Sequence, residues 1–194
     1  MSEILKLYHT SSKEIKSPDV NFGRQNADFS GGFYLSDNPE FSGKWASAAN
    51  NCINSYELDL TGLKVKRLFL DEEWFNYISK NRMGYDDMFS EFDVIIGPIA
   101  NDTLYDTLGI ITSGLLKSES ALKLLSVGKK YTQINVKTEK AASQLKWLGS
   151  TVLSADEIEN ARNAVKNEEK EFRAAFFETL KEIDEFEMIN EMLG

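Results

Sequence analysis

The sequence has few of the residues that form covalent or metal cross-links. Its 194 residues include one cysteine, Cys52, one histidine, His9, and three prolines. A single cysteine excludes a disulfide within the chain, and a structural zinc site usually needs about four thiolate or imidazole ligands. We therefore interpret Cys52 as a small core residue. A reactive thiol is the less favoured alternative, because no neighbour in the sequence would activate it.

The chain also lacks long apolar runs and a secretory signal. Its longest apolar stretches, such as Val94-Ile95-Ile96, are far shorter than the ~20 residues that span a bilayer. The N-terminus, Met1-Ser2-Glu3-Ile4-Leu5-Lys6, has neither the basic start nor the apolar middle of a signal peptide. We expect no membrane partner and a cytoplasmic location, or export by a route that needs no cleaved signal.

Positive charge is scarce and unevenly placed. The chain has 31 acidic and 22 basic residues, a net charge of −9 at pH 7. Residues 154–194 hold 12 acidic and 5 basic residues, a net charge of −7, which leaves −2 for residues 1–153. Neither part has the concentrated basic face that neutralises phosphates, so we do not expect a tightly bound duplex nucleic acid. A nucleic acid as a transient substrate stays open.

The length and the composition favour one domain with an appendage. Apolar residues make up 42% of the chain, which allows a hydrophobic core, and domains usually run to ~100–150 residues. Helices and strands are interspersed without a regular βαβ repeat, which indicates an α+β fold. The patterns predict strands over 4–8, 33–35, 55–60, 64–70, 92–96 and 131–136, and helices over 39–49, 72–82, 103–111, 119–126 and 138–147.

The C-terminal part reads as a separate acidic helix. Ser154-Ala155-Asp156-Glu157 is a capping box and predicts a helix start at Ser154. We therefore divide the chain into a domain over 1–153 and an acidic amphipathic helical extension over 154–194. Two interpretations of the extension stay open: it packs on its own domain, or it docks a protein partner or second subunit. Its apolar residues recur at helical spacing: Ile158, Val165, Phe172, Phe176, Leu180, Ile183, Phe186 and Ile189.

The candidate site residues begin near the N-terminus. His9 ends the first predicted strand, and Ser17–Gly32 is a long irregular loop, which in a compact domain tends to be functional. Tyr34 follows this loop and precedes Trp45 by eleven residues. A lone histidine or a strand tyrosine is usually an ordinary structural residue. Their combination with a second aromatic residue fits a slot for a flat heterocycle attached to a ribose.

These segments resemble a known family. Leu7-Tyr8-His9-Thr10-Ser11, then Asp28-Phe29-Ser30-Gly31-Gly32-Phe33-Tyr34-Leu35-Ser36 and Lys44-Trp45-Ala46 are similar to motifs of a bacterial family of ADP-ribosyltransferase-like domains of uncharacterised function. The resemblance covers about residues 4–153 and extends, more distantly, to diphtheria toxin and the poly-ADP-ribose polymerases. It implies a split β-sheet core with surrounding helices. Further matches follow in order at Trp74, Asn81-Arg82, 93–102 and 133–141.

The resemblance implies that NAD is the substrate and that three residues are catalytic. His9, Tyr34 and Gln133 stand where the distant relatives have a His-Tyr-Glu triad. By this resemblance His9 hydrogen-bonds the adenosine-side ribose and Tyr34 stacks on the nicotinamide ring. Gln133 departs from the pattern: an amide accepts a hydrogen bond but carries no charge and takes no proton. We therefore expect mono- rather than poly-ADP-ribosylation.

Five further residues are candidates for binding NAD. By the resemblance, the backbone of Thr10 and the side chain of Ser42 bind the nicotinamide amide, and Trp45 is a second stacking aromatic. Thr10 stands where a glycine is common. Gly32 would let the backbone approach the ligand closely, and Arg24 would pair with the pyrophosphate as a charged fork. An exposed loop arginine without such a role is an equal alternative.

The sequence leaves several functions open. The leading hypothesis is a mono-ADP-ribosyltransferase that modifies a macromolecule, a protein more readily than a nucleic acid, as a bacterial or phage toxin or defence effector with a possible antitoxin on the C-terminal helix. The alternatives are a degenerate fold that serves as a binding module, and an NAD glycohydrolase. Asn101 and Asp102 are candidates for contacts with the acceptor, although plain turn residues are the simpler interpretation.

Overall fold

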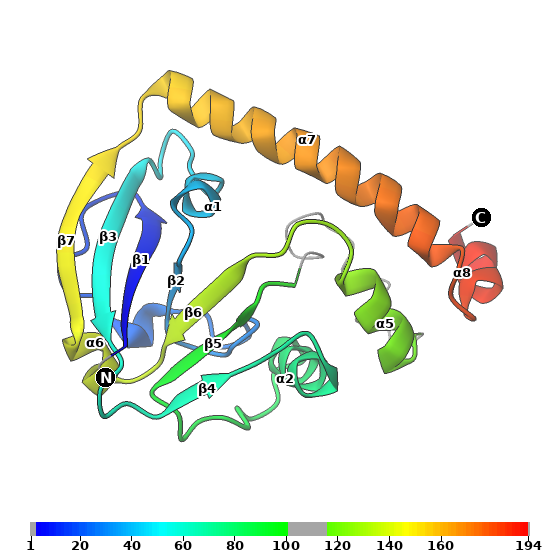
Figure 1. Cartoon of the computed structure of the whole chain (residues 1–194), viewed down its shortest axis with the longest axis horizontal. Helices are drawn as coiled ribbons and strands as arrows, with labels where there is room; N and C mark the ends of the chain where they lie inside the picture. Colours follow the sequence, from blue (N-terminus) through cyan, green and yellow to red (C-terminus); the bar gives the residue numbers. More distant parts are fainter. Residues whose placement is uncertain (1–2, 101–115, 194) are drawn as a thin grey trace.

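The computed structural model describes residues 3–100 and 116–193 and confirms an α+β fold (Figure 1). Seven strands form one sheet in the order β4-β5-β6-β2-β1-β3-β7. The strands are β1 (Ile4–Ser11), β2 (Phe33–Ser36), β3 (Cys52–Asp59), β4 (Val65–Arg67), β5 (Val94–Pro98), β6 (Thr132–Val136) and β7 (Leu145–Val152). The helices are η1 (Val20–Phe22), α1 (Pro39–Gly43), α2 (Glu72–Arg82), α5 (Ser118–Leu125), α6 (Glu139–Ser143), α7 (Ala155–Leu180) and α8 (Phe186–Leu193).

The sheet consists of two halves that meet at one residue pair. β1 is paired with β3 along its whole length, from Ile4 opposite Asp59 to Ser11 opposite Cys52. Its register with β2 contains only Tyr8 opposite Ser36. In Figure 1 the half made of β7, β3 and β1 therefore turns away from the half made of β2, β6, β5 and β4. The opening between the halves lies just beyond Tyr8.

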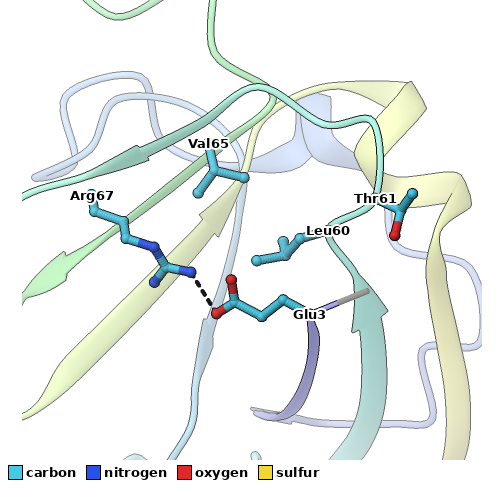
Figure 2. Close-up of a pocket in the computed structure, with 5 residues that line it drawn as sticks. All are labelled: Glu3, Leu60, Thr61, Val65 and Arg67. Atoms are coloured by element: carbon cyan, nitrogen blue, oxygen red, sulfur yellow. Dashed lines mark hydrogen bonds and ion pairs between the residues drawn. The ribbon is translucent and has the colours of Figure 1, made fainter. Parts of the chain in front are cut away.

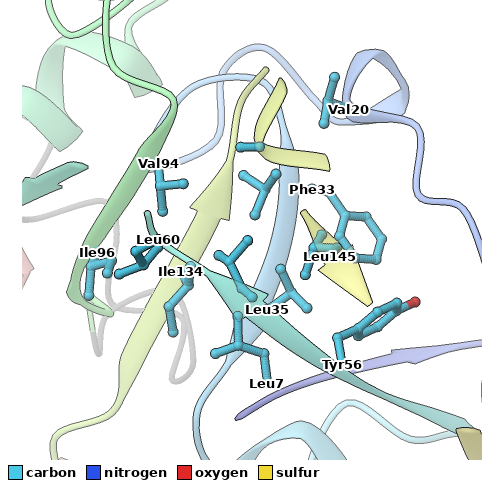
Figure 3. Packing of buried hydrophobic residues seen from close by; sticks show 13 residues of the cluster. Leu7, Val20, Phe33, Leu35, Tyr56, Leu60, Val94, Ile96, Ile134 and Leu145 are labelled. Atoms are coloured by element: carbon cyan, nitrogen blue, oxygen red, sulfur yellow. The ribbon is translucent and has the colours of Figure 1, made fainter. Parts of the chain in front are cut away.

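The main core lies on one side of the sheet (Figure 3). Alternation along each strand places every second residue there, as in β3, where Tyr56 and Leu58 are fully buried. Strands from both halves contribute, so this core holds the halves together. Its buried members are Leu7, Val20, Phe33, Leu35, Tyr56, Leu58, Leu60, Val94, Ile96, Ile134, Val136, Ala141 and Leu145.

A second core lies between the other side of β5 and the helices α2 and α5. Trp74 of α2 is fully buried there, and its Nε1 donates a hydrogen bond to the carbonyl of Pro98 at 2.9 Å. Asp71 is the N-cap of α2, and its side chain accepts a hydrogen bond from the backbone N–H of Trp74. The predicted helix over 72–82 is thus confirmed, with an acidic N-cap as its start signal.

The C-terminal extension packs on the domain. The capping box at Ser154 is confirmed, because Ser154 and Glu157 exchange both hydrogen bonds at the start of α7. Three apolar side chains of α7, Phe172, Phe176 and Leu180, are buried in one cluster with Leu124 of α5. For these residues the interpretation of an intramolecular packing face is confirmed. Phe177 on the same helix is 52% exposed.

Two predicted helices were too long. The helix after Asn38 ends at Gly43, and the chain continues through turns in which the N–H of Trp45 bonds to the carbonyl of Ser42. The helix over 138–147 ends at Ser143, and residues 145–152 form β7 instead. Antiparallel pairing with β3 over seven positions outweighs the helical propensity of this segment.

Other boundaries shifted or lie outside the described residues. The strand predicted over 64–70 is limited to Val65–Arg67. The loop Ser17–Gly32 is irregular as predicted, apart from the short helix η1. The predicted helix 103–111 and the candidates Asn101 and Asp102 fall in the segment that the structure does not describe. Across the described part of the chain, no helix combines the length and apolar character needed to cross a membrane.

Candidate functional site

One cleft gathers the eight residues that the sequence analysis nominated as catalytic or NAD-binding. It has a volume of about 1280 Å³ and opens where the two halves of the sheet separate. A volume of this order accommodates a ligand larger than a typical drug molecule. The nominated residues in its lining are His9, Thr10, Arg24, Gly32, Tyr34, Ser42, Trp45 and Gln133. Their convergence is shown; their catalytic and binding roles stay predictions.

His9 bridges the two halves of the sheet. If the ladder between β1 and β2 continued past Tyr8, Thr10 would lie opposite Tyr34. Instead, the imidazole Nδ1 of His9 lies 2.7 Å from the carbonyl oxygen of Tyr34, so Nδ1 carries the proton and donates it. Burial lowers the pKa of His9, and the hydrogen bond to Tyr34 only partly offsets this. The neutral ring therefore presents Nε2 as a hydrogen-bond acceptor.

The hydroxyl of Tyr34 is hydrogen-bonded to the backbone of the protein. It donates to the carbonyl of Ser30 at 2.7 Å and accepts from the N–H of Phe29 at 2.9 Å. Burial, the largest cause, raises the pKa of Tyr34 well above its usual value, so the phenol stays protonated. The hydroxyl thus holds the loop before β2, and what Tyr34 offers the cleft is its ring.

Two asparagines hold the same loop from the other side. Asn135 Nδ2 donates to the carbonyls of Phe29 and Gly31, and Asn81 Nδ2 donates to the carbonyl of Asp28. Gly32 has a φ of 144°, and a Cβ there would lie 2.1 Å from Asn135 Oδ1. The glycine is required by this packing against β6, which is a structural reason distinct from the predicted approach to a ligand.

Gln133 contributes a buried amide with an unused donor. It lies on β6 opposite Ser36, two residues from Asn135 and on the sheet face that Tyr34 shares. Its Nε2 is buried and has no hydrogen-bond acceptor among the described residues. Leaving such a donor unpaired costs about 1–3 kcal/mol. A rotation of the side chain that turns Nε2 toward the cleft would let an acceptor atom of a ligand remove this cost.

The opposite wall of the cleft is formed by α1 and the turn after it. Thr10 Oγ1 donates to the carbonyl of Ser42 at 2.5 Å, which ties β1 to this wall. Ser42 itself is buried. Trp45 is 52% exposed and meets the ring of Phe41 edge to face. Trp45 therefore lies at the rim of the cleft, where one side of the residue contacts Phe41 and about half of the residue is exposed to solvent.

The lining of the cleft has an excess of one positive charge, although the chain carries a net charge of −9. Its lining includes Lys13, Arg24 and Arg82 but only two carboxylates, Asp19 and Asp28. Arg82 is paired with Asp28 at 2.7 Å, and Asp19 caps η1. Arg24 has no carboxylate partner among the described residues and is free to bind an anion.

Sequence reasoning missed several lining residues. Phe22 is 91% exposed and Met83 is 57% exposed, so both add apolar surface at the rim. The Asp28–Arg82 ion pair lies in the wall, with both side chains 12% exposed. Asp28 and Arg82 belong to quoted motifs, so the resemblance contained a signal for them. No local pattern distinguished Phe22 or Met83 from ordinary loop residues.

A smaller pocket of about 310 Å³ lies at another edge of the sheet (Figure 2). Its two charged side chains neutralise each other, since Arg67 bonds to Glu3 at 2.5 Å. Leu60, Thr61 and Val65 complete its lining, and none of the nominated residues reaches it.

Fold and cleft together define an α+β protein with a ligand-sized site in the opening of its sheet. Over residues 5–147 the chain matches the family described as "Protein of unknown function (DUF3990)", and it belongs to that family. The description assigns no activity. No curated protein matches the chain.

Proposed function

We propose that this chain is an NAD-dependent mono-ADP-ribosyltransferase that modifies a macromolecule. In this proposal the divided sheet is the ADP-ribosyltransferase-like arrangement, and the cleft between its halves binds NAD as a substrate. The observation that carries the proposal is the meeting of His9, the ring of Tyr34 and the unpaired amide of Gln133 in one cleft. These groups come from three separate segments of the chain.

The polar groups of the cleft fit the parts of a dinucleotide. His9 offers an acceptor to a ribose hydroxyl, and Gln133 contributes a carboxamide to the lining of the cleft. Arg24 supplies a guanidinium for the pyrophosphate. Tyr34 and Trp45 supply aromatic surface for a flat ring, from the wall and from the rim.

The reaction demands positioning more than acid–base chemistry. Cleavage of the bond between nicotinamide and ribose passes through an oxocarbenium-like state, as in glycoside hydrolysis. Nicotinamide leaves as a neutral molecule, so no general acid is required. Residues that hold the ribose and exclude water therefore account for much of the rate. Gln133 cannot accept a proton or stabilise a cation by charge, which favours a single transfer over chain growth.

The proposed acceptor is a protein rather than a nucleic acid. The chain is acidic, with a pI of about 4.8. The described lining of the cleft contains only three basic side chains. That is too few for the phosphate contacts that hold duplex nucleic acid. A cytoplasmic toxin or defence effector of a bacterium or phage, with an antitoxin bound at the C-terminal helix, completes the proposal.

A binding module without catalysis is the second candidate. It is favoured by the state of the two carboxylates in the lining, because Asp19 caps a helix and Asp28 is paired with Arg82. Among the described lining residues no carboxylate is left to stabilise a sugar cation. In this case the same cleft binds NAD or another nucleotide without cleaving it.

Nicotinamide release separates these functions. The purified chain is incubated with NAD and released nicotinamide is quantified, with His9→Asn as the impaired variant and Glu169→Gln on α7 as the matched control. Mass spectrometry of cell protein and RNA then locates an added ADP-ribose. Release with a modified protein supports the transferase, and release without any adduct indicates a glycohydrolase. Binding without release, or no binding of NAD at all, contradicts both enzymatic functions and favours a module.

Restoring a carboxylate at position 133 tests the catalytic role of Gln133. Gln133→Glu adds a charge that stabilises the sugar cation, so we expect faster nicotinamide release. An unchanged rate, with NAD affinity retained, would show that the position is not catalytic.

A further inference from the structure

The C-terminal helix reaches the wall of the cleft through a buried charge cluster. The ammonium of Lys44 bonds to the carboxylate of Glu168 and to the hydroxyl of Tyr131, and Tyr131 donates to Glu168 at 3.0 Å. The side chain of Lys44 is 7% exposed and that of Glu168 is 21% exposed. Lys44 also lies over the ring of Tyr131, 4.4 Å from its centroid. Three elements thus meet at one point.

Lys44 and Tyr131 both adjoin residues of the cleft. Lys44 caps the C-terminus of α1 and directly precedes Trp45. The ring of Tyr131 stacks on Phe41 with centroids 4.3 Å apart, and both pack with Ile99. Phe41, Ile99 and Trp45 all line the cleft. A movement of the cluster therefore moves the wall that carries the proposed nicotinamide contacts.

α7 is suited to act as a support for this cluster. Its N-terminus follows β7 and is fixed by the capping box, while Phe172 and Phe176 are anchored against α5. Glu168 lies between these attachments in the sequence and is paired with Lys44, the C-cap residue of α1. Figure 1 shows the course of α7 from β7 toward α8. Burial raises the pKa of Glu168, but the hydrogen bonds from Lys44 and Tyr131 outweigh it and lower the pKa overall. The carboxylate is therefore charged at neutral pH.

We propose that the C-terminal extension completes the cleft, with Glu168 as the residue that positions the α1 wall through Lys44 and Tyr131. Glu168 lies outside the matched family region, residues 5–147, so this chain supplies part of its own site from beyond that region. The effect on NAD rests on the proposed function, whereas the effect on the wall does not.

Point variants test the proposal without removing the helix. Glu168→Gln keeps the shape of the side chain and removes its charge. Glu169→Gln makes the same change at the next residue, whose carboxylate bonds to Arg173 on the exposed side of α7. The rate of amide hydrogen exchange over residues 39–46 measures the local stability of the wall without any ligand. The rate over residues 52–59 measures the stability of the sheet. Calorimetry with NAD then gives the affinity.

We expect Glu168→Gln to speed exchange over 39–46 by about tenfold and to weaken NAD binding by a similar factor, because a hydrogen bond to a charged group is lost. Exchange over 52–59 should stay as in the wild type. Glu169→Gln should change neither quantity, and Glu168→Asp, which keeps the charge, should recover most of the affinity.

Other outcomes overturn the proposal in distinguishable ways. Unchanged exchange over 39–46 in Glu168→Gln would show that the wall does not depend on α7. Faster exchange everywhere would show a general loss of stability instead of positioning. Faster exchange with unchanged NAD affinity would show that the wall does not serve the ligand. If the wild type binds no NAD, the proposed function fails, and hydrogen exchange alone decides whether Glu168 positions the wall.

Discussion

His9 Nδ1 and the carbonyl oxygen of Tyr34 lie 2.7 Å apart across the opening of the sheet. A side chain here takes the place of a backbone ladder bond, because the register of β1 and β2 stops at Tyr8 and Ser36. The ring of His9 also packs on Phe33, with centroids 4.4 Å apart. These contacts fix the ring in one orientation and one tautomer, with Nε2 available as an acceptor.

The affinity for NAD should fall when His9 is protonated. Since burial lowers its pKa, protonation occurs below the usual value of about 6.5. Protonation converts Nε2 from an acceptor into a donor, so a ribose hydroxyl loses its partner. Calorimetry should give a constant affinity between about pH 7 and 8 and a decline below about pH 6.5. An affinity that rises on acidification would contradict this role.

The same residue should link stability to pH. The unfolded chain binds the proton of His9 at a higher pH than the folded chain does. The stabilisation by neutral His9 is therefore complete above about pH 6.5 and is lost as the pH falls toward the lowered pKa. Urea unfolding of wild type and His9→Asn across this range measures the difference, which should narrow on acidification. A difference independent of pH would argue against a buried neutral ring.

Removing the amide of Gln133 should stabilise the protein and weaken NAD binding. Gln133→Met replaces a buried, unpaired donor by an apolar group of similar size, so the free energy of unfolding should rise by about 1 kcal/mol. Gln144→Met is the matched control, since Nε2 of Gln144 donates to the carbonyls of Asp59 and Thr61. The control should lose stability and keep its NAD affinity. If Gln133→Met also loses stability, its amide is not an unused donor.

Tyr34→Phe should loosen the loop before β2. The variant keeps the ring but removes the hydroxyl that bonds to Phe29 and Ser30, which leaves a backbone donor unpaired. We expect a loss of about 1–3 kcal/mol in the free energy of unfolding. Tyr85→Phe, at a position that is 65% exposed, is the control and should be neutral. Equal stability of the two variants would show that the buried hydroxyl contributes little.

Gly32 and Gly62 separate steric conflict from backbone strain. Both have positive φ, 144° and 75°, but a Cβ at position 32 meets Asn135 Oδ1 at 2.1 Å, whereas position 62 has nothing within 4 Å. Gly62→Ala should cost about 1–2 kcal/mol through strain alone. Gly32→Ala should cost clearly more or prevent folding. Circular dichroism during thermal unfolding compares them, and equal costs would show that the contact with Asn135 adapts freely.

Local signals predicted the parts of the fold that depend on local chemistry. Ser154 and Glu157 form a capping box, and α7 begins directly after Ser154. α2 follows from its apolar spacing and occupies residues 72–82 as predicted. β7 was missed because its first three residues, 145–147, continue the helical pattern of 138–144, whereas they become a strand by pairing with β3. Pairing between distant segments is a property of the whole chain.

The order of the motifs allowed the residues of the cleft to be predicted, but not the hydrogen bonds that they form. Ordered motifs nominated His9, Tyr34 and Gln133, and the structure brings all three to one cleft. The internal use of the Tyr34 hydroxyl depends on the path of the loop at Phe29 and Ser30, which no pattern encodes. The contact of Glu168 with the α1 wall depends on the direction of α7.

The single pair of Tyr8 and Ser36 makes the junction of β1 and β2 the mechanical weak point of the sheet. A force that separates the two halves should break this junction before any other strand pair, since the neighbouring ladders contain several bonds each. A dinucleotide bound across the junction would add contacts that hold the two halves together. Occupancy of the cleft would then appear as mechanical reinforcement: a higher rupture force in single-molecule pulling.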